Sequence, residues 1–230
     1  MRFGAELSGV GDWRRIRRWA VPIVGVLVAL GAIAWFTPML AVREVRIEGV
    51  SAVPEEQVRE LLAIPDGLSI LRIDTAAMAT RVSEIPKVRS VRVRRSLPAT
   101  VQVTVQERTP VLYYGDPQEA HLLDADGVEY AIESAPIGVP RLRTEHPGMD
   151  DPLTRAAVEV ATALPPALEI QVDEVIARSL SDISLTLRDG RAVLWGSSAD
   201  AERKSAVVMP LLTREGTVFD VSSPSLVTVR

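Results

Sequence analysis

The segment "VRSVRVRRSLPATVQVTVQER" (88–108) decides the fold of the first half of the chain. Valines alternate with arginines or other polar residues on both sides of the central "SLPAT" turn. An alternation of period two is typical of strands that bury one face, and a short loop between two such runs indicates a strand pair. The inward-facing side chains of this pair are expected at Val91, Val93, Val101, Val103 and Val105.

One more strand and two helices precede this pair. "VREVRIEGV" (42–50) alternates in the same way, and "VPEEQVRELL" (53–62) has acidic residues in its first turn and apolar residues at helical spacing. Asp74 is placed to cap a second helix that ends before Pro86. The predicted order is β-α-α-β-β, a small sheet with two helices on one face. Its expected core residues are Ile47, Val58, Leu61, Met78, Val82, Val91 and Val103.

Residues 19–42 form an apolar stretch without a charged side chain. A helix of this length extends about 36 Å at roughly 1.5 Å per residue, enough to cross a bilayer core of about 30 Å. We therefore expect a transmembrane helix over 20–42. The arginine cluster at 14–18 predicts that the tail 1–19 is cytoplasmic and that the chain from Arg43 onward lies outside.

A cleaved signal peptide is the alternative interpretation of this stretch. "AIA" at 32–34 is similar to a cleavage site. Against this alternative, the apolar region of a signal peptide is short, about 7–15 residues, whereas this one continues to Val42. The length of the stretch favours a retained anchor.

Residues 111–230 read mainly as strands, with a helix that begins at Asp151 and another that begins near Ala199. "SSAD" (197–200) has the pattern of a capping box for the second helix, and Pro210 should kink or break that helix after Val207. We expect a mostly antiparallel, curved sheet with helices on one face. The whole chain is therefore predicted to be an α+β protein.

Composition limits the chemistry that the chain can perform. It has no cysteine, and its two histidines, His121 and His146, share no motif. The net charge of −4 divides into +3 over residues 1–19 and −7 over the rest, which leaves no basic stripe for nucleic acid. Glycine-rich phosphate loops, serine elbows and helices with paired histidines are missing from the sequence. We predict no catalysis, no cofactor or metal site, and no small-molecule substrate.

Two motifs follow the apolar stretch and the β-α-α-β-β pattern in order: "P-x-T-V-x-V-x-V-x-E-R-x-P" (98–110) and "LLDADGVEY" (122–130). This succession resembles the FtsQ family of bacterial cell-division proteins, called DivIB in some bacteria. "DG" (189–190), "WG" (195–196), Lys204 and "DVSSP" (220–224) continue the resemblance. It implies a POTRA domain over 43–110 and an FtsQ-type β-domain over 111–230.

The resemblance also implies a function. FtsQ-like proteins are non-catalytic scaffolds of the division machinery, in the cytoplasmic membrane at the division septum. They bind the small division proteins FtsB (DivIC) and FtsL, and through them connect to the septal wall synthases FtsW and FtsI. Two alternatives remain open: a POTRA-bearing transport or secretion component, and a membrane-anchored cell-wall enzyme, which would need two opposed carboxylates in a cleft.

The last stretch, "FDVSSPSLVTVR" (219–230), reads as strand to its final residue. An open terminal strand is a template for pairing with another chain. The structural alternative is an ordinary terminal strand protected by Arg230 and solvent. Because FtsQ-like proteins bind FtsB at their last strand, the resemblance favours a partner-binding edge. Its predicted residues are Phe219, Ser225, Leu226, Val227, Thr228, Val229 and Arg230.

Two details qualify this edge. Many relatives continue past the position of Arg230, so contacts made by such a tail are not expected here. Proline at Thr228 should weaken partner binding more than folding if that N–H points outward, and should harm folding if the N–H points inward. Proline at Val227 is the paired control.

Two other features allow both a structural and a functional interpretation. Arg89, Arg92, Arg94 and Arg95 are either a solvated sheet face beside a negatively charged membrane or a second docking face for an acidic partner helix. Trp195 is either a recognition residue or part of the core. One sequence does not decide between these interpretations.

Overall fold

The computed structural model describes residues 20, 22–26 and 40–230. The described chain divides into two compact units between Glu107 and Arg108. Most of the predicted membrane span, 20–42, lies outside the described residues. Within the described part, residues 20 and 22–26 are helical, and none of the helices is both long and apolar enough to cross a bilayer. Residues 40–42 belong to the first unit, where Ala41 forms a β-bridge with Ser69.

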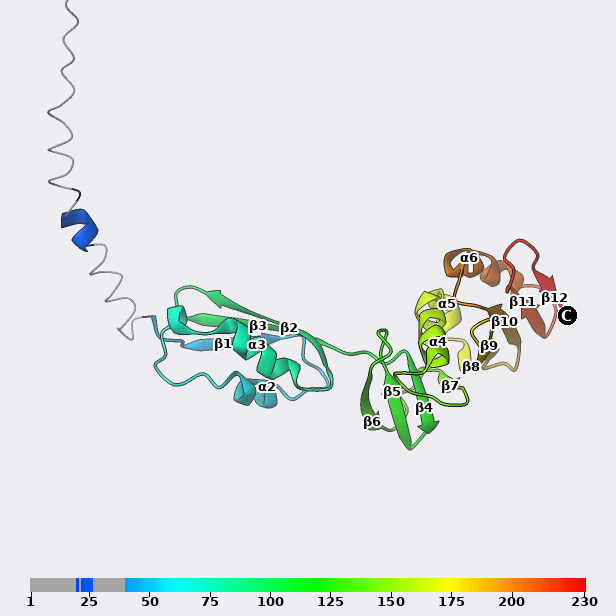
Figure 1. The fold of residues 1–230 in the computed structure, drawn as a ribbon, viewed down its shortest axis with the longest axis horizontal. Helices are drawn as coiled ribbons and strands as arrows, with labels where there is room; N and C mark the ends of the chain where they lie inside the picture. The colour runs from blue at the N-terminus through cyan, green and yellow to red at the C-terminus, as the bar shows by residue number, and fades with distance from the viewer. Residues whose placement is uncertain (1–19, 21, 27–39) are drawn as a thin grey trace, which may run out of the picture. The chain divides into compact units, whose positions relative to one another are not determined.

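The first unit is a three-stranded sheet with two helices packed on one face (Figure 1). Its sheet order is β1-β3-β2, with β1 parallel and β2 antiparallel to the central strand β3. The β-α-α-β-β order agrees with the prediction. The elements are β1 (Glu44–Glu48), α2 (Glu55–Leu62), the short 3₁₀ helix η2 (Ile70–Arg72), α3 (Thr75–Ser83), β2 (Val88–Ser96) and β3 (Thr100–Glu107).

The core of the first unit lies between the helices and the sheet. Four of the predicted core residues, Val58, Met78, Val82 and Val103, are buried. Ile47, Leu61 and Val91 are half-buried and pack against this core. Leu62 rather than Leu61 is fully buried, because neighbouring residues on a helix point about 100° apart and only one can face the sheet. The Asp74 side chain caps α3 as predicted, accepting hydrogen bonds from two backbone N–H groups.

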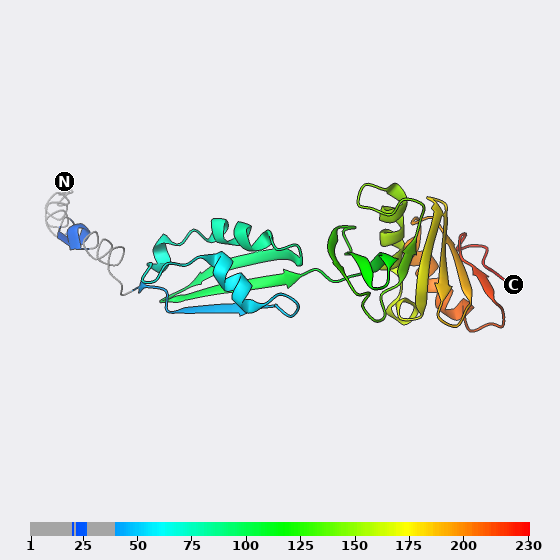
Figure 2. The ribbon, with the colours of Figure 1, turned by 90° about the horizontal axis from the view of Figure 1, so that it is seen from below.

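The second unit is a nine-stranded, mostly antiparallel sheet accompanied by helices (Figure 2). Side chains of α4, α5 and α6 belong to the same core as those of the sheet. The sheet order is β12-β11-β10-β9-β8-β7-β4-β5-β6, with parallel pairs at β10–β11, β4–β7 and β7–β8. Its helices are α4 (Pro152–Ala163), α5 (Pro166–Glu169) and α6 (Ala201–Leu211). Its strands are β4 (Leu112–Asp116), β5 (Glu119–Leu123), β6 (Glu129–Glu133), β7 (Arg141–Arg143), β8 (Val172–Ser179), β9 (Asp182–Leu187), β10 (Ala192–Gly196), β11 (Val218–Asp220) and β12 (Thr228–Val229).

Two predictions for helix α6 are wrong. The helix continues through Pro210 to Leu211 instead of breaking after Val207. Proline removes a single N–H donor, and only one helical residue follows it here. The helix also begins at Ala201 without a capping box. Its cap residue, Asp200, has a left-handed backbone (φ 53°) and its side chain makes no capping hydrogen bond.

Candidate partner-binding edge

Strand β12 forms one end of the nine-stranded sheet (Figure 1). Its two residues pair antiparallel with β11, so that Val229 lies opposite Phe219 and Thr228 lies opposite Asp220. Among the residues that the structure describes, β12 has no second strand as a neighbour. Its outer backbone groups are therefore open to another chain.

The hydrogen-bond ladder between β11 and β12 fixes which backbone groups of β12 point outward. The N–H of Val218 donates to the carbonyl oxygen of Arg230 at 3.0 Å, and the N–H of Arg230 donates to that of Val218 at 2.9 Å. Hydrogen-bonded and non-hydrogen-bonded pairs alternate along an antiparallel ladder. Thr228 therefore directs its N–H and C=O inward to β11, and Val229 directs its own outward. The proline test at Thr228 consequently reports on folding, and Val229 is the residue that offers a donor and an acceptor to a partner.

A glycine holds β12 close to the preceding loop. A Cβ atom on Gly216 would lie 2.3 Å from Val229 Cγ1 and 3.0 Å from the carbonyl oxygen of Arg230. The φ angle of Gly216, +152°, also lies in a region that side chains disfavour. The adjacent Thr217 donates its N–H to the Arg230 carbonyl oxygen at 2.7 Å. Only glycine fits here without displacing the strand.

β12 differs from the other three sheet edges in the described residues. Charged side chains and register shifts are devices that keep an edge from pairing with other chains. β2 and β6 have both devices, and β1 has charged residues. Neither residue of β12 is charged, although Arg230 follows the strand. The charged residues on these three edge strands are Glu44, Arg46 and Glu48 on β1, Arg89, Arg92, Arg94 and Arg95 on β2, and Glu129 and Glu133 on β6.

The terminal strand is shorter than its sequence predicts. After β11, the Asp220 side chain accepts hydrogen bonds from the N–H and Oγ of Ser222 at 3.0 and 2.6 Å, which turns the chain. The N–H of Leu226 then donates to the Ser223 carbonyl at 2.9 Å, closing a second turn. Ser225 and Leu226 consequently lie in this turn and not in the strand, and the Leu226 side chain is 75% exposed. Val227, just before β12, is half-buried against the core.

Two aromatic candidates are core residues. Phe219 is fully buried in β11, and the Arg191 guanidinium lies over its ring at 5.5 Å from the centroid. Trp195 in β10 is fully buried as well. Neither side chain is accessible to a partner, so Phe219 supports β12 from beneath instead of contacting what binds there.

Lys204 is a buried residue whose position the sequence did not indicate. Its side chain is almost fully buried, and Nζ donates to the Ser197 carbonyl at 2.8 Å. Burial lowers the pKa of this ammonium, and the Asp200 carboxylate partly offsets that effect. Ser197 follows Gly196, where a Cβ would lie 2.9 Å from the Ser222 Cβ. Lys204 thus fixes the loop that packs against the turn leading to β12.

The four arginines of the predicted second docking face are not equivalent. Arg95 donates to the Ile73 carbonyl and Arg89 also has an interaction partner. Arg92 and Arg94 are exposed and lie opposite Thr104 and Gln102 of β3. The face that they share with β3 is polar, which is typical of a solvated sheet surface. A docking function for this face stays a prediction.

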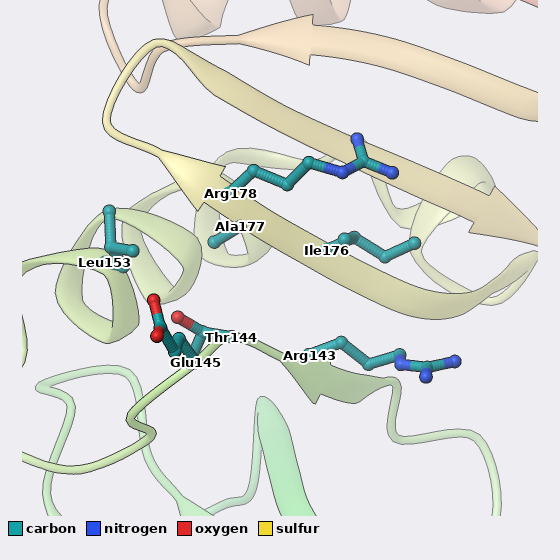
Figure 3. Close-up of a pocket in the computed structure, with 7 residues that line it drawn as sticks. All are labelled: Arg143, Thr144, Glu145, Leu153, Ile176, Ala177 and Arg178. Carbon is teal, nitrogen blue, oxygen red and sulfur yellow. The ribbon is translucent and has the colours of Figure 1, made fainter.

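The second unit also has an open pocket of about 340 Å³ where β7 ends beside β8 (Figure 3). Figure 3 shows Arg143, Ile176 and Arg178 on one side of these strands and Thr144, Glu145 and Leu153 gathered at the end of β7. Arg143 pairs with Glu174 at 3.4 Å, and Arg178 with Asp182 at 3.8 Å. The pocket's charges are therefore already partly neutralised within the unit.

A hydrogen-bonded cluster joins β4, β5 and β6. The Tyr114 hydroxyl donates to Glu129 Oε2 at 2.5 Å, and His121 Nδ1 lies 2.8 Å from Glu129 Oε1. Burial and the neighbouring Glu129 raise the pKa of Tyr114 to about 12, while the Tyr114 and His121 hydrogen bonds outweigh burial and lower the pKa of Glu129. Tyr114 therefore stays protonated and Glu129 ionised near neutral pH. Nowhere in the described chain are three His, Asp or Glu side chains grouped to hold a metal ion.

The motif "LLDADGVEY" owes its pattern to one turn. Asp124 is buried, accepts the N–H groups of Asp126 and Val128 at 2.9 Å each, and forms an ion pair with Arg108. Gly127 completes the turn with a left-handed φ of +74°. Arg108 belongs to the first quoted motif and Asp124 to the second, so one ion pair joins the two motifs.

Comparisons with known proteins give the family. Residues 40–108 match the family of POTRA domains of the FtsQ type. The cell division protein FtsQ of Corynebacterium glutamicum is 34% identical over 213 residues, covering 91% of this chain and 96% of that protein. The chain belongs to the FtsQ family.

Two other relatives, both FtsQ proteins, support the assignment to this family. FtsQ of Streptomyces collinus is 33% identical over 230 residues, with 92% of this chain and 87% of the relative covered. FtsQ of Mycolicibacterium smegmatis is 41% identical, with 94% of this chain but only 65% of the relative covered. The chain thus spans about two thirds of the length of that relative. The FtsQ-type POTRA match begins at Leu40, in agreement with the packing of residues 40–42 against the first unit.

Proposed function

We propose that this member of the FtsQ family is a non-catalytic scaffold of the bacterial division machinery that binds an FtsB-type partner through β12. Through FtsB and FtsL it would connect to the septal wall synthases FtsW and FtsI. The names of its relatives support a role in cell division. The scaffold would sit in the cytoplasmic membrane at the division septum, held by the apolar stretch 20–42, with both units outside.

The observation that carries the proposal is the open, uncharged outer edge of β12. Val229 presents one N–H and one C=O to an incoming strand, since the pairing of Val218 with Arg230 leaves these groups outward. A partner segment in extended conformation can add to such an edge by main-chain hydrogen bonds. The partner's alternate side chains would then meet the exposed Thr228 side chain on one face of the edge.

A two-residue edge gives few hydrogen bonds, each worth only about 0.5–1.5 kcal/mol. Two features compensate for the short edge. The supporting strand β11 is buried and anchored by Phe219, so little ordering is needed when a partner strand adds. Partners tethered in one membrane also meet at a high effective concentration.

Proline substitutions test the edge in the full-length protein reconstituted with an FtsB-type partner. Val229→Pro removes the outward N–H, and Val229→Ala is the matched control that shortens the side chain but keeps the N–H. We expect Val229→Pro to bind about tenfold more weakly than Val229→Ala, since an unmade hydrogen bond leaves a partner carbonyl unsatisfied. Thr228→Pro breaks the inner ladder, so its main effect should be a lower melting temperature.

Partner binding that is equal for Val229→Pro and Val229→Ala, both folded by circular dichroism, would remove β12 as the site. The topology has its own test. A reporter that is active only outside the membrane should be active when fused after Arg230. Activity of the same reporter fused before Met1 would reverse the proposed orientation.

A further inference from the structure

The tip of the β2–β3 hairpin presents an exposed leucine. Leu97 lies in the turn between Ser96 and Thr100, and its side chain is 67% exposed. Single exposed leucines are common on protein surfaces. What sets this one apart is the set of residues that the fold gathers around it.

The hairpin tip lies at the end of the first unit where the apolar stretch joins it. The N–H of Arg43 donates to the Ala99 carbonyl at 2.9 Å, and Glu44 lies opposite Thr100 in the β1–β3 pair. Ala41 in turn bridges to Ser69, next to η2. The turn with Leu97 and the η2 segment therefore flank the point at which the chain arrives from the uncharged stretch 19–42.

This end of the unit is basic. Arg43 at the junction, Arg72 in η2 and Arg94 near the hairpin tip are all exposed. Of the nearby carboxylates, Glu44 pairs with Arg46 at 2.7 Å and Asp74 caps α3. Asp66 is exposed and lines the same pocket as Arg43, so the arginines at this end outnumber the carboxylates that are not already engaged. An exposed apolar side chain surrounded by arginines is the combination that suits the headgroup region of a bilayer with anionic lipids.

We propose that the hairpin tip is a second membrane contact, with Leu97 inserted among the headgroups of an anionic bilayer and Arg43, Arg72 and Arg94 facing lipid phosphates. The proposal goes beyond partner binding at β12 and rests only on the membrane insertion of the stretch 20–42. Charge complementarity and continuity with that stretch both select a lipid surface as the occupant. Such a contact would fix the tilt of the first unit on the membrane.

The expected effects are moderate. An arginine near an anionic membrane surface contributes about 1 kcal/mol, which corresponds to about a fivefold change in the insertion equilibrium. Replacing Leu97 by serine removes the apolar side chain and should lower insertion about tenfold. Because Leu97 is exposed, this change should leave the folded unit intact.

Site-specific labelling tests the contact, and the chain has no cysteine that would compete for the label. Full-length Leu97→Cys, carrying an environment-sensitive dye, is reconstituted in vesicles of phosphatidylcholine with or without phosphatidylglycerol. Headgroup-attached quenchers report the depth of the dye. Ser51→Cys is the matched control, because Ser51 is exposed near Glu107, at the opposite end of the sheet.

We expect strong quenching and a blue shift at position 97 in anionic vesicles, weaker signals in neutral vesicles, and neither at position 51. Arg72→Gln with Arg94→Gln should reduce quenching at position 97. Equal quenching at positions 97 and 51 in vesicles that contain the chain would overturn the contact. A blue shift at position 97 that requires an added division protein would assign the tip to a protein partner and overturn it too. A chain that does not float with the vesicles would overturn the contact and the anchor together, while leaving β12 untouched.

Discussion

Strands β2 and β12 are both sheet edges, but they are built in opposite ways. β2 is nine residues long, has arginines along its length and contains a register shift. β12 is two residues long and uncharged. Because charge and irregularity discourage strand addition, the longer edge is the protected one. Under the proposal, the capacity of an edge to pair depends more on its charge and irregularity than on its length.

The two edges also rest on different supports. β2 pairs with β3, which is packed by the two helices of a small unit. β12 rests on β11, whose Phe219 is fully buried in a much larger core. A short edge on a rigid support can receive a strand without being reorganised itself.

Loss of the support should have the largest effect. Phe219→Ala is expected to lower the free energy of unfolding of the second unit by about 3–5 kcal/mol, because a buried aromatic ring leaves a cavity. Partner binding at β12 should be lost with it. Denaturant unfolding and partner titration measure both quantities. Val103→Ala, equally buried in the first unit, should destabilise that unit and leave partner binding unchanged; loss of binding in this control would contradict separate supports.

A smaller displacement is expected from Gly216→Ala. The new Cβ would collide with Val229 and the backbone would be strained, at a cost of about 1–3 kcal/mol. We expect weaker partner binding in a unit that remains folded, measured by titration and melting temperature. Gly138→Ala is the matched control: its φ is also positive (+95°), but no atom lies within 4 Å of the added Cβ. Similar binding losses in both variants would mean that the close approach of Gly216 to β12 is unimportant.

The first unit should respond to acid through Glu107. Its carboxylate accepts backbone N–H groups of Ser51, Ala52 and Val53 at 2.8–3.0 Å. Burial opposes ionisation, but these hydrogen bonds outweigh it and the pKa of Glu107 lies below its ordinary value of 4.5. The carboxylate's stabilisation is therefore complete above about pH 4.5 and is lost as the pH falls through the lower pKa of the folded state.

Glu107→Gln should cost about 1–2 kcal/mol at neutral pH and flatten this acid dependence. Melting curves of the protein between pH 3 and 7 (roughly the carboxylate range) provide the measurement. Glu60→Gln, an exposed change on α2, is the control and should leave the profile unchanged. Identical pH profiles of the melting temperature for Glu107→Gln and the unchanged protein would exclude this stabilising role of the Glu107 carboxylate.

The smallest effect on stability should come from adding a charged side chain to β12. Thr228 is exposed, so Thr228→Lys should change the free energy of unfolding by less than about 0.5 kcal/mol. Partner binding should nevertheless weaken, because a charge on the open edge is the device that β2 uses. Thr104→Lys, on the exposed face of β3, is the control. Binding that is unaffected by Thr228→Lys would argue against charge as the feature that prevents strand addition at a sheet edge.

Local patterns predicted the first unit well. The segment 88–108 becomes β2 and β3 as its alternation indicated, and Asp74 caps α3. Periodicity could not choose between Leu61 and Leu62, because the direction of a helix face depends on how the helix packs. The position of Lys204 was equally hidden, since only the folded loop brings the Ser197 carbonyl to its ammonium.

The terminal strand lies at an edge of the sheet, as its sequence indicated, but its length and the direction of its N–H groups differ from what the sequence could predict. β-branched residues indicated a long terminal strand, yet the hydrogen bonds of Asp220 and Leu226 turn the chain until Thr228. The direction of each N–H in β12 depends on its register with β11, which a single sequence does not contain. The alternation of side chains can be recognised in the sequence. Which N–H groups of a strand face its neighbour depends on the register of the pairing, which the sequence alone does not contain.

Amide hydrogen exchange at Val229 tests the central claim most directly. In the free protein, the N–H of Thr228 should exchange slowly because it is paired with β11, and the outward N–H of Val229 should exchange fast. Adding the FtsB-type partner should slow exchange at Val229 and leave Thr228 nearly unchanged. Partner binding with Val229 still exchanging at its free rate would contradict strand addition at β12.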